Sequence, residues 1–490
     1  MRTKANMCQL FALFESVRRL FSYRNEVIMK IRPSVKSGLN IIIVGCGKVG
    51  STLTEQLTKE GHDITLIDQD PAKIQNLANL YDVMGIVGTG ASYSVQMEAG
   101  IESADLIIAV TDSDELNLLC CTVAKRVGHC AAIARVRNPD YSDEIAYLRE
   151  KLGLAMIINP DLSAALEAAR VLSLPLALEV HSFAHGQAEN IQVKLPEDNV
   201  LVGQDIASLG RSGLSQNILI CAVERDTDVI IPSGDFQFAA GDRISFISSH
   251  ADARIFLKKI GLQVNQARNT MIVGGGKTAY YLAKRLLEIG IDVKIIEQNR
   301  ARCEELSILL PEAIIINGDG TDVDLLKEEG IEYVQSFIPL TGIDEENIML
   351  TLHAQQVSKT KVITKINRFN FKGIINQLDL GSVVYPKYIT SEAIIAYVRA
   401  KHASIGSNIE TLYHIFDSRV EAIEFRVQEA SAVTGISLMD LQLKKNLLVA
   451  AITRNGKMII PTGTDTIEVN DNVVIVTTHS GFGDLQDILL

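Results

Sequence analysis

The sequence predicts an α/β protein with two doubly wound, parallel-sheet Rossmann-like domains, each followed by a small α+β domain. Two observations support this fold class. Residues 39–160 alternate short apolar runs with helical stretches, the pattern of a parallel sheet covered on both faces. Four sequence blocks of the first half also return in the second half, in the same order and 229 or 230 residues later.

The repeated blocks indicate a duplication, because a period this long excludes a solenoid. Asn40–Gly50 returns as Thr270–Ala279, Gly88–Ala91 as Gly318–Thr321, Thr111–Asn117 as Thr341–Asn347, and Ile230–Gly234 as Ile459–Gly463. In the first half we expect strands over 41–44, 64–67, 85–87, 106–110 and 131–136, and helices over 51–60 and 114–127. Short alternating runs such as 217–224 and 242–248 predict the strands of the small domain.

The chain of 490 residues divides into five predicted segments. We expect an N-terminal extension over 1–38, nucleotide-binding domains over 39–160 and 269–386, and small C-terminal-type domains over 177–261 and 405–490. The extension places Leu10, Leu13, Phe14, Val17 and Phe21 near helical spacing. It is either a membrane-surface helix or a loose tail upstream of a second start at Met29.

Composition narrows the classes of partner and compartment. The net charge is −12 and only the first 38 residues are basic, which argues against a nucleic-acid partner. Seven scattered cysteines without a C-x-x-C pair are typical of reduced thiols in a cytoplasmic protein. No apolar run is long enough to span a bilayer, and the histidines show no metal-binding spacing. We expect neither a metal site nor a catalytic nucleophile.

The strongest motif is a dinucleotide-binding phosphate loop. Gly45, Gly47 and Gly50 form G-x-G-x-x-G between an apolar run and a helix. The first glycine allows the tight turn, the second lets backbone approach a pyrophosphate, and the third lets the helix pack on the strand. The start of the helix offers free N–H groups to the phosphates. The other candidate loop residues are Cys46, Lys48 and Val49.

The acid that follows each loop at the same distance makes the motif specific. Asp68 lies 23 residues after Gly45, and Glu297 lies 23 residues after Gly274. A carboxylate there accepts hydrogen bonds from ribose hydroxyls and disfavours a 2′-phosphate, so NAD(H) or an adenine nucleotide is favoured over NADP. The second loop consists of Gly274, Gly275, Gly276, Lys277 and Thr278, with Ala279 at the third glycine position. Lys48 and Lys277 either reach phosphate or are solvated.

Further candidate ligand residues follow the other predicted strands. In doubly wound sheets, ligands bind where the carboxyl ends of the strands meet. These candidates are Gly88, Thr89, Thr111, Asp112 and Arg135 in the first half, and Gly318, Asp319 and Lys365 in the second. For Arg135 and Lys365 an ion pair with a neighbouring acid is as well supported as a ligand contact.

These motifs, with the segment Ala134–Tyr141, resemble the tandem regulator-of-potassium-conductance domains of the TrkA family, the peripheral subunits of Trk potassium-uptake systems. The resemblance covers residues 39–490. It implies a dimeric or tetrameric homo-oligomeric ring under a membrane potassium transporter, bound to the inner face of the membrane through that partner. It also implies binding of NAD(H) and of ATP or ADP at the candidate residues. Thr89 and Gly342 depart from the polar residues usual in the family.

Three functions remain to be weighed. A non-enzymatic regulator that gates the transporter is the leading one. An NAD-dependent oxidoreductase is the alternative, although the small domains offer no evident acid or base for a substrate. A scaffold with vestigial pockets is the third.

Overall fold

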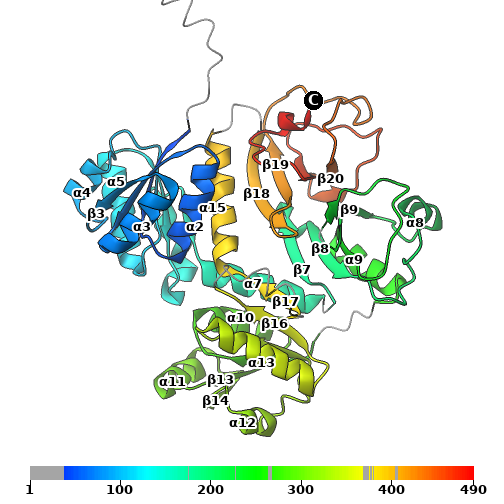
Figure 1. The fold of residues 1–490 in the computed structure, drawn as a ribbon, viewed down its shortest axis with the longest axis horizontal. Coiled ribbons are helices and arrows are strands. Elements are labelled where there is room, and N and C mark those ends of the chain that lie inside the picture. The colour runs from blue at the N-terminus through cyan, green and yellow to red at the C-terminus, as the bar shows by residue number, and fades with distance from the viewer. Residues whose placement is uncertain are drawn as a thin grey trace, which may run out of the picture.

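The computed structural model describes residues 38–490 except 175, 227, 263–266, 368–374, 376, 377, 379 and 403–406. The expected amphipathic segment within 1–37 therefore lies outside the described residues. Within them the chain forms four sheets, two parallel and two antiparallel, arranged around two central helices (Figure 1).

The first parallel sheet has the strand order β3-β2-β1-β4-β5-β6. Its strands are β1 (Asn40–Val44), β2 (Asp63–Asp68), β3 (Met84–Val87), β4 (Leu106–Ala109), β5 (Ala131–Arg135) and β6 (Met156–Ile158). β1 and β4 are buried along most of their length, as expected for central strands covered on both faces. The chain reverses direction across the sheet between β1 and β4, and this switch point opens a crevice at the carboxyl ends of the strands.

The second parallel sheet repeats this order as β14-β13-β12-β15-β16-β17. Its strands are β12 (Asn269–Val273), β13 (Asp292–Glu297), β14 (Ile314–Asn317), β15 (Ser336–Pro339), β16 (Lys361–Lys365) and β17 (Ser382–Val384). The predicted pair of doubly wound domains is thus confirmed. The sequence prediction missed β6 and β17, because runs of three residues carry too little periodicity to be recognised.

Helices connect the parallel strands. The first half has α2 (Lys48–Lys59), α3 (Pro71–Tyr81), α4 (Tyr93–Glu98), α5 (Asp114–Val127), α6 (Ile145–Lys151) and α7 (Pro160–Ser173). The second half has α10 (Lys277–Glu288), α11 (Arg300–Leu309), α12 (Val323–Glu328), α13 (Asp344–Val357) and α15 (Pro386–His402). Local signals set their starts: Asp70 accepts hydrogen bonds from the first turn of α3, and Ser113 does the same for α5.

An antiparallel sheet follows each parallel one. The first, in the order β10-β9-β11-β8-β7, is built from β7 (Glu179–Phe183), β8 (Ala188–Lys194), β9 (Ile218–Arg225), β10 (Asp228–Ile230) and β11 (Arg243–Ser248), with α8 (Ile206–Ser212) and α9 (His250–Lys259). The second, in the order β18-β19-β22-β20-β21, contains β18 (Ser407–Ile415), β19 (Val420–Val427), β20 (Leu447–Arg454), β21 (Lys457–Ile459) and β22 (Asn472–Thr477).

The two halves exchange helices. α7 leaves the first sheet and packs on α10 of the second half, whereas α15 leaves the second sheet and packs on α2 of the first, as Figure 1 shows. One hydrophobic core accordingly joins α7 and the first small domain to the second parallel sheet. Another joins α15 and the second small domain to the first parallel sheet. The cores therefore do not follow the order of the predicted domains along the chain, whose boundaries stay a prediction.

Candidate functional site

The first phosphate loop has the backbone geometry that its glycines predict. Gly45 has φ +103°, a left-handed conformation that side chains disfavour. A Cβ added at Gly50 would lie 1.9 Å from the carbonyl oxygen of Gly45, so helix and strand approach too closely for any side chain. Gly47 precedes α2 with no side-chain cap, which leaves the helix N-terminus open. An N-terminus of this kind attracts anions.

The acid after each loop holds that loop through backbone hydrogen bonds. Asp68 accepts from the N–H of Cys46 at 2.6 Å, and Glu297 accepts from the N–H of Gly275 at the same distance. The second carboxylate oxygen of each accepts from the backbone two residues further on, at 2.9 Å for Asp68 and 2.7 Å for Glu297. These acids therefore lie beside the phosphate loop, at the end of β2 or β13, as their spacing predicts.

A buried asparagine joins the ends of β4 and β5. Asn117 is fully buried and accepts from the N–H of Thr111 at 2.8 Å. Its amide donates to the carbonyl oxygens of Thr111 and Arg135, at 3.1 and 2.9 Å. Nearby, Asp114 accepts from the backbone N–H groups of Arg137 and Asn138. The repeated Thr-x-x-Asp-Glu-x-Asn block is thus a clamp that fixes two strand ends at the crevice.

Arg135 forms the predicted ion pair with a neighbouring acid, and its contact with a ligand stays a prediction. Its guanidinium donates to the carbonyl oxygen of Thr111 and pairs with Asp112 at 3.1 Å, and the residue also lines the cleft described below. Burial lowers the pKa of Arg135, and the neighbouring Arg137 adds to this shift. The arginine therefore supplies a partly desolvated cation at the end of β5.

The second half repeats the clamp with small changes. Asn347 accepts from the N–H of Thr341 at 2.9 Å and donates to the carbonyl oxygens of Thr341 and Lys365. The ammonium of Lys365 donates to the carbonyl oxygen of Leu340 at 3.0 Å. Asp319, at the end of β14, is exposed and accepts from the N–H and hydroxyl of Thr321, which lowers its pKa.

A cleft of about 720 Å³ opens above the first phosphate loop. A drug-sized or larger ligand fits a cleft of this volume. It is lined by nine of the twelve residues predicted for the first half: Gly45, Gly47, Lys48, Val49, Asp68, Gly88, Thr111, Asp112 and Arg135. The other three lie elsewhere, because Cys46 packs into the core, Gly50 packs on Gly45 and Thr89 is an exposed loop residue outside the lining.

The second half also contributes to this cleft, which the sequence did not predict. Asn367, Pro386 and Lys387 lie in its wall, together with Pro160 and Asp161 from the start of α7. Only the helix exchange brings Lys387 there. A sequence signal existed, since a proline follows the last strand of each sheet and is itself followed by a charged residue. This signal could be interpreted only once the arrangement of the two halves was known.

The TrkA-N domain model matches residues 41–160 and 270–386, and the TrkA-C domain model matches 190–261 and 422–490. The chain belongs to the TrkA family. A TrkA homologue of Archaeoglobus fulgidus, named a Trk system potassium uptake protein, is 32% identical and is covered over 100% of its length by 92% of this chain. TrkA of Haemophilus influenzae is also 32% identical, over 89% of this chain and 95% of its own.

Solved structures share the fold of this TrkA-family chain. The RCK domain of the GsuK channel matches with a TM-score of 0.60 at 15% identity, over 92% of this chain and 96% of that one. The GsuK channel bound to NAD matches with a TM-score of 0.59 at 16% identity, over 96% of this chain and 83% of that one. Family membership assigns the chain to the regulation of potassium transport, as the sequence motifs predicted, and does not favour the oxidoreductase alternative.

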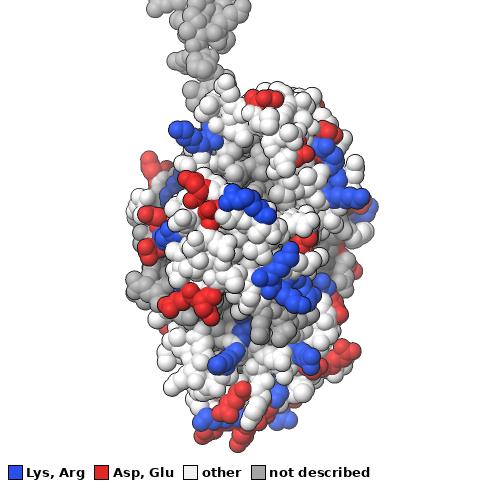
Figure 2. Space-filling model, turned by 90° about the vertical axis from the view of Figure 1, so that its right-hand side faces the viewer, with Lys and Arg blue, Asp and Glu red and all other residues white. Residues whose placement is uncertain are grey.

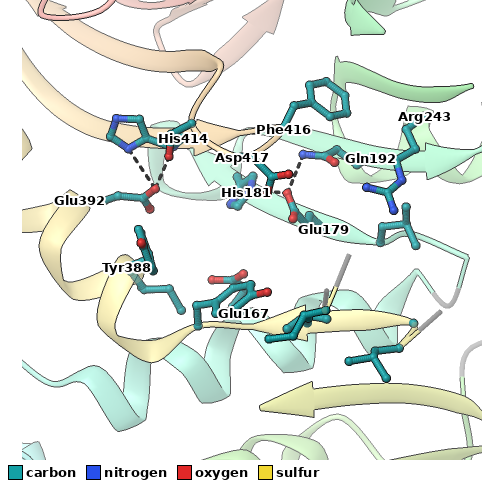
Figure 3. A pocket seen from close by; sticks show the side chains of 18 of the residues that line it. Glu167, Glu179, His181, Gln192, Arg243, Tyr388, Glu392, His414, Phe416 and Asp417 are labelled. Carbon is teal, nitrogen blue, oxygen red and sulfur yellow. Dashed lines mark hydrogen bonds and ion pairs between the residues drawn. The ribbon is translucent and has the colours of Figure 1, made fainter. Parts of the chain in front are cut away.

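A second cavity, of about 240 Å³, lies between the small domains and the exchanged helices of this TrkA-family chain (Figure 3). Glu167 of α7 and His181 of β7 face it from one half, and Glu392 of α15 and His414 of β18 face it from the other. Burial raises the pKa of Glu167 to about 7. Burial alone would lower the pKa of His414. Hydrogen bonds to Glu392 and Glu421 have the larger effect and raise this pKa to about 9. Among the described residues, no cluster of three or more His, Cys, Asp or Glu side chains could hold a metal ion.

The outer face of the small domains carries mixed charges. Figure 2 shows basic and acidic side chains interspersed there rather than gathered into one basic stripe. Among the described residues no helix is both long and apolar enough to cross a bilayer. The six cysteines that the structure describes are buried free thiols.

Proposed function

We propose that the candidate residues bind NAD(H), or ATP or ADP, and that the bound nucleotide regulates a membrane potassium-uptake transporter. In the first half the phosphates lie over the Gly45–Val49 loop, and the adenosine ribose lies beside Asp68. To receive the ribose hydroxyls, the carboxylate of Asp68 gives up part of its bonding to the N–H groups of Cys46 and Asp70. NAD is the first ligand to test, because a solved channel of this fold is described as bound to it.

The first cleft carries this proposal, because its wall comes from both halves of the chain. A ligand that contacts the Gly45–Val49 loop and Asp161 at the start of α7 bridges two bodies with separate cores. Such a ligand favours one arrangement of the two bodies over another. It shifts the equilibrium only as far as its affinities for the two arrangements differ.

The same chain is proposed to act without catalysing a reaction. A hydride transfer needs an acid or base near the nicotinamide. The described residues that line the cleft include no histidine, cysteine or tyrosine, and its lysines, arginines and carboxylates suit the binding of phosphates and ribose hydroxyls. Turnover of NADH dependent on an added substrate would favour the oxidoreductase alternative instead.

The partner is proposed to be a membrane potassium-transporter subunit, with the chain at the inner face of the membrane. The relatives' name, Trk system potassium uptake protein, supports this partner. Assembly into a homo-oligomer, a dimer or a tetrameric ring, is proposed on the resemblance to the family. Co-purification with the transporter and light scattering of the complex test both proposals.

Calorimetric titration of NADH, NAD, ATP and ADP tests the ligand assignment. Asp68→Ala is expected to weaken binding in the first half and Glu297→Ala in the second, each without unfolding the chain. Unchanged affinity for all four nucleotides in both variants would overturn the assignment. Equal nucleotide affinity of the free and transporter-bound chain would overturn the gating role, because no differential affinity would remain.

A further inference from the structure

The two phosphate loops face opposite charges from the other half. Pro160 and Pro386 each follow the last strand of a parallel sheet and begin the exchanged helices α7 and α15. The next residue is Asp161 at the start of α7 and Lys387 at the start of α15. The duplication therefore places an anion and a cation at equivalent positions.

Asp161 contacts the second phosphate loop directly. Its carboxylate accepts a hydrogen bond from the hydroxyl of Thr278 at 2.5 Å, and Thr278 is 5% exposed. Thr278 lies in the first turn of α10, where the helix N-terminus favours a negative group. A side-chain carboxylate thus occupies the electrostatic environment that the loop would offer to a phosphate.

The first phosphate loop has no such carboxylate bond. Val49 stands where the second loop has Thr278, so the side chain there has no hydroxyl to donate. Lys387 lines the first cleft together with Lys48, Arg135 and Arg137, and the carboxylates of Asp68, Asp112 and Asp161 line it as well. The N-terminus of α2, whose first-turn residues Lys48 and Val49 line the same cleft, carries no side-chain cap.

Lys365 is a buried cation of the second half, and nearby carboxylates partly compensate its charge. Burial lowers the pKa of Lys365, and the carboxylates of Asp161 and Asp344 act against that shift. Asp161 therefore bonds to the second loop and also favours the charged form of Lys365.

We infer that the two sites are unequal, with the first loop binding pyrophosphate tightly and Asp161 holding the second loop in a low-affinity state. Lys387 supplies charge to the first site from the other half of the chain. Asp161 must leave Thr278 before a nucleotide phosphate can bind at the second site. This inference rests on the proposed nucleotide sites and adds which of them is filled first.

Two matched glycine variants isolate the sites. A Cβ added at Gly47 or Gly276 meets nothing within 4 Å, and both glycines cap a helix. Aspartate is a good N-cap residue, so Gly47→Asp and Gly276→Asp should fold while placing a negative charge in one loop each. We expect Gly47→Asp to abolish the tight binding of NADH or ATP in calorimetry and Gly276→Asp to leave it within twofold.

The role of Asp161 is tested in the Gly47→Asp variant, in which the first site is disabled. Adding Asp161→Asn to Gly47→Asp keeps the shape of the side chain and removes its charge. The affinity of the second site should rise about tenfold, the effect of roughly one nearby unit charge. Asp292→Asn is the matched control, because Asp292 is an exposed acid at the start of β13 and should change nothing.

Lys387→Gln in the otherwise unchanged chain should weaken the tight site about threefold to tenfold. Equal losses in Gly47→Asp and Gly276→Asp would overturn the inference, as would equal affinities of the Asp161→Asn and Asp292→Asn double variants. If the unchanged chain binds neither NADH nor ATP, the proposed function itself fails.

Discussion

Arg399 of α15 donates to Glu60, at the end of α2, with an Nη2–Oε1 distance of 2.6 Å, although the two residues are 339 positions apart. The same guanidinium pairs with Glu421 of β19 at 2.9 Å, and its side chain is 7% exposed. One buried cation therefore ties the first parallel sheet to the second small domain.

Arg399→Met is expected to lower the free energy of unfolding by about 3–5 kcal/mol, because the buried carboxylate of Glu421 and the partly buried carboxylate of Glu60 lose their arginine partner. Denaturant unfolding followed by circular dichroism measures the change. Arg300→Met is the matched control, since the Arg300–Glu304 pair is 84% and 68% exposed, and it should cost less than about 0.5 kcal/mol. Equal effects of the two variants would contradict the structural role of Arg399.

Gly50→Ala should destabilise the first phosphate loop by about 1–3 kcal/mol, because the new methyl group overlaps the carbonyl of Gly45. Gly47→Ala adds the same group where space is open and should change stability by less than about 0.5 kcal/mol. Thermal unfolding of both variants decides the prediction, which fails if Gly50→Ala is as stable as Gly47→Ala.

Asn117→Ala is expected to lower stability by about 2 kcal/mol or more, since it leaves several buried backbone groups unpaired. It should also weaken nucleotide binding at the first site, because the ends of β4 and β5 lose their clamp. Asn347→Ala makes the same change in the second half. In Asn347→Ala, the nucleotide affinity of the first site, measured by calorimetry, should equal that of the unchanged chain. A loss of affinity as large as in Asn117→Ala would contradict separate roles for Asn117 and Asn347.

Glu167→Gln should make stability less dependent on pH. Burial raises the pKa of Glu167 to about 7 in the folded chain, from 4.5. The folded state then binds more protons than the unfolded state between these values, so this residue lowers stability as the pH rises from about 4.5 to 7. The variant should be more stable than the unchanged chain by about 1–3 kcal/mol at pH 8 and equal to it at pH 4. An equal gain at both pH values would contradict this cause.

His414 also makes stability fall as the pH rises, but here the charged form is the one that the fold stabilises. Its pKa is raised to about 9, so its ion pairs with Glu392 and Glu421 stabilise the fold fully below about pH 6.5 and are lost as the pH rises through about 9. His414→Gln should therefore be destabilised at pH 6 and approach the unchanged chain at pH 10. Urea unfolding across this range measures it, and a pH-independent loss would show a packing effect instead.

The sequence predicted both Rossmann-like domains and the loops because glycine spacing and buried strands are local signals. It also placed Asp68 and Glu297 correctly at the ends of their strands. It could not predict that Lys387 lines the first cleft or that Asp161 reaches Thr278. Those contacts depend on which half each exchanged helix packs against, and an apolar helix face does not encode its partner.

The exchange of α7 and α15 has a consequence for how the chain acquires its fold. The first parallel sheet shares its core with α15 and the second small domain, so that core stays incomplete until nearly the whole polypeptide has been made. Joining the halves in one chain lets this pairing form at a high local concentration, whatever the amount of protein present. It also pairs each half with its unlike counterpart, which allowed the Asp161 and Lys387 positions to diverge after the duplication.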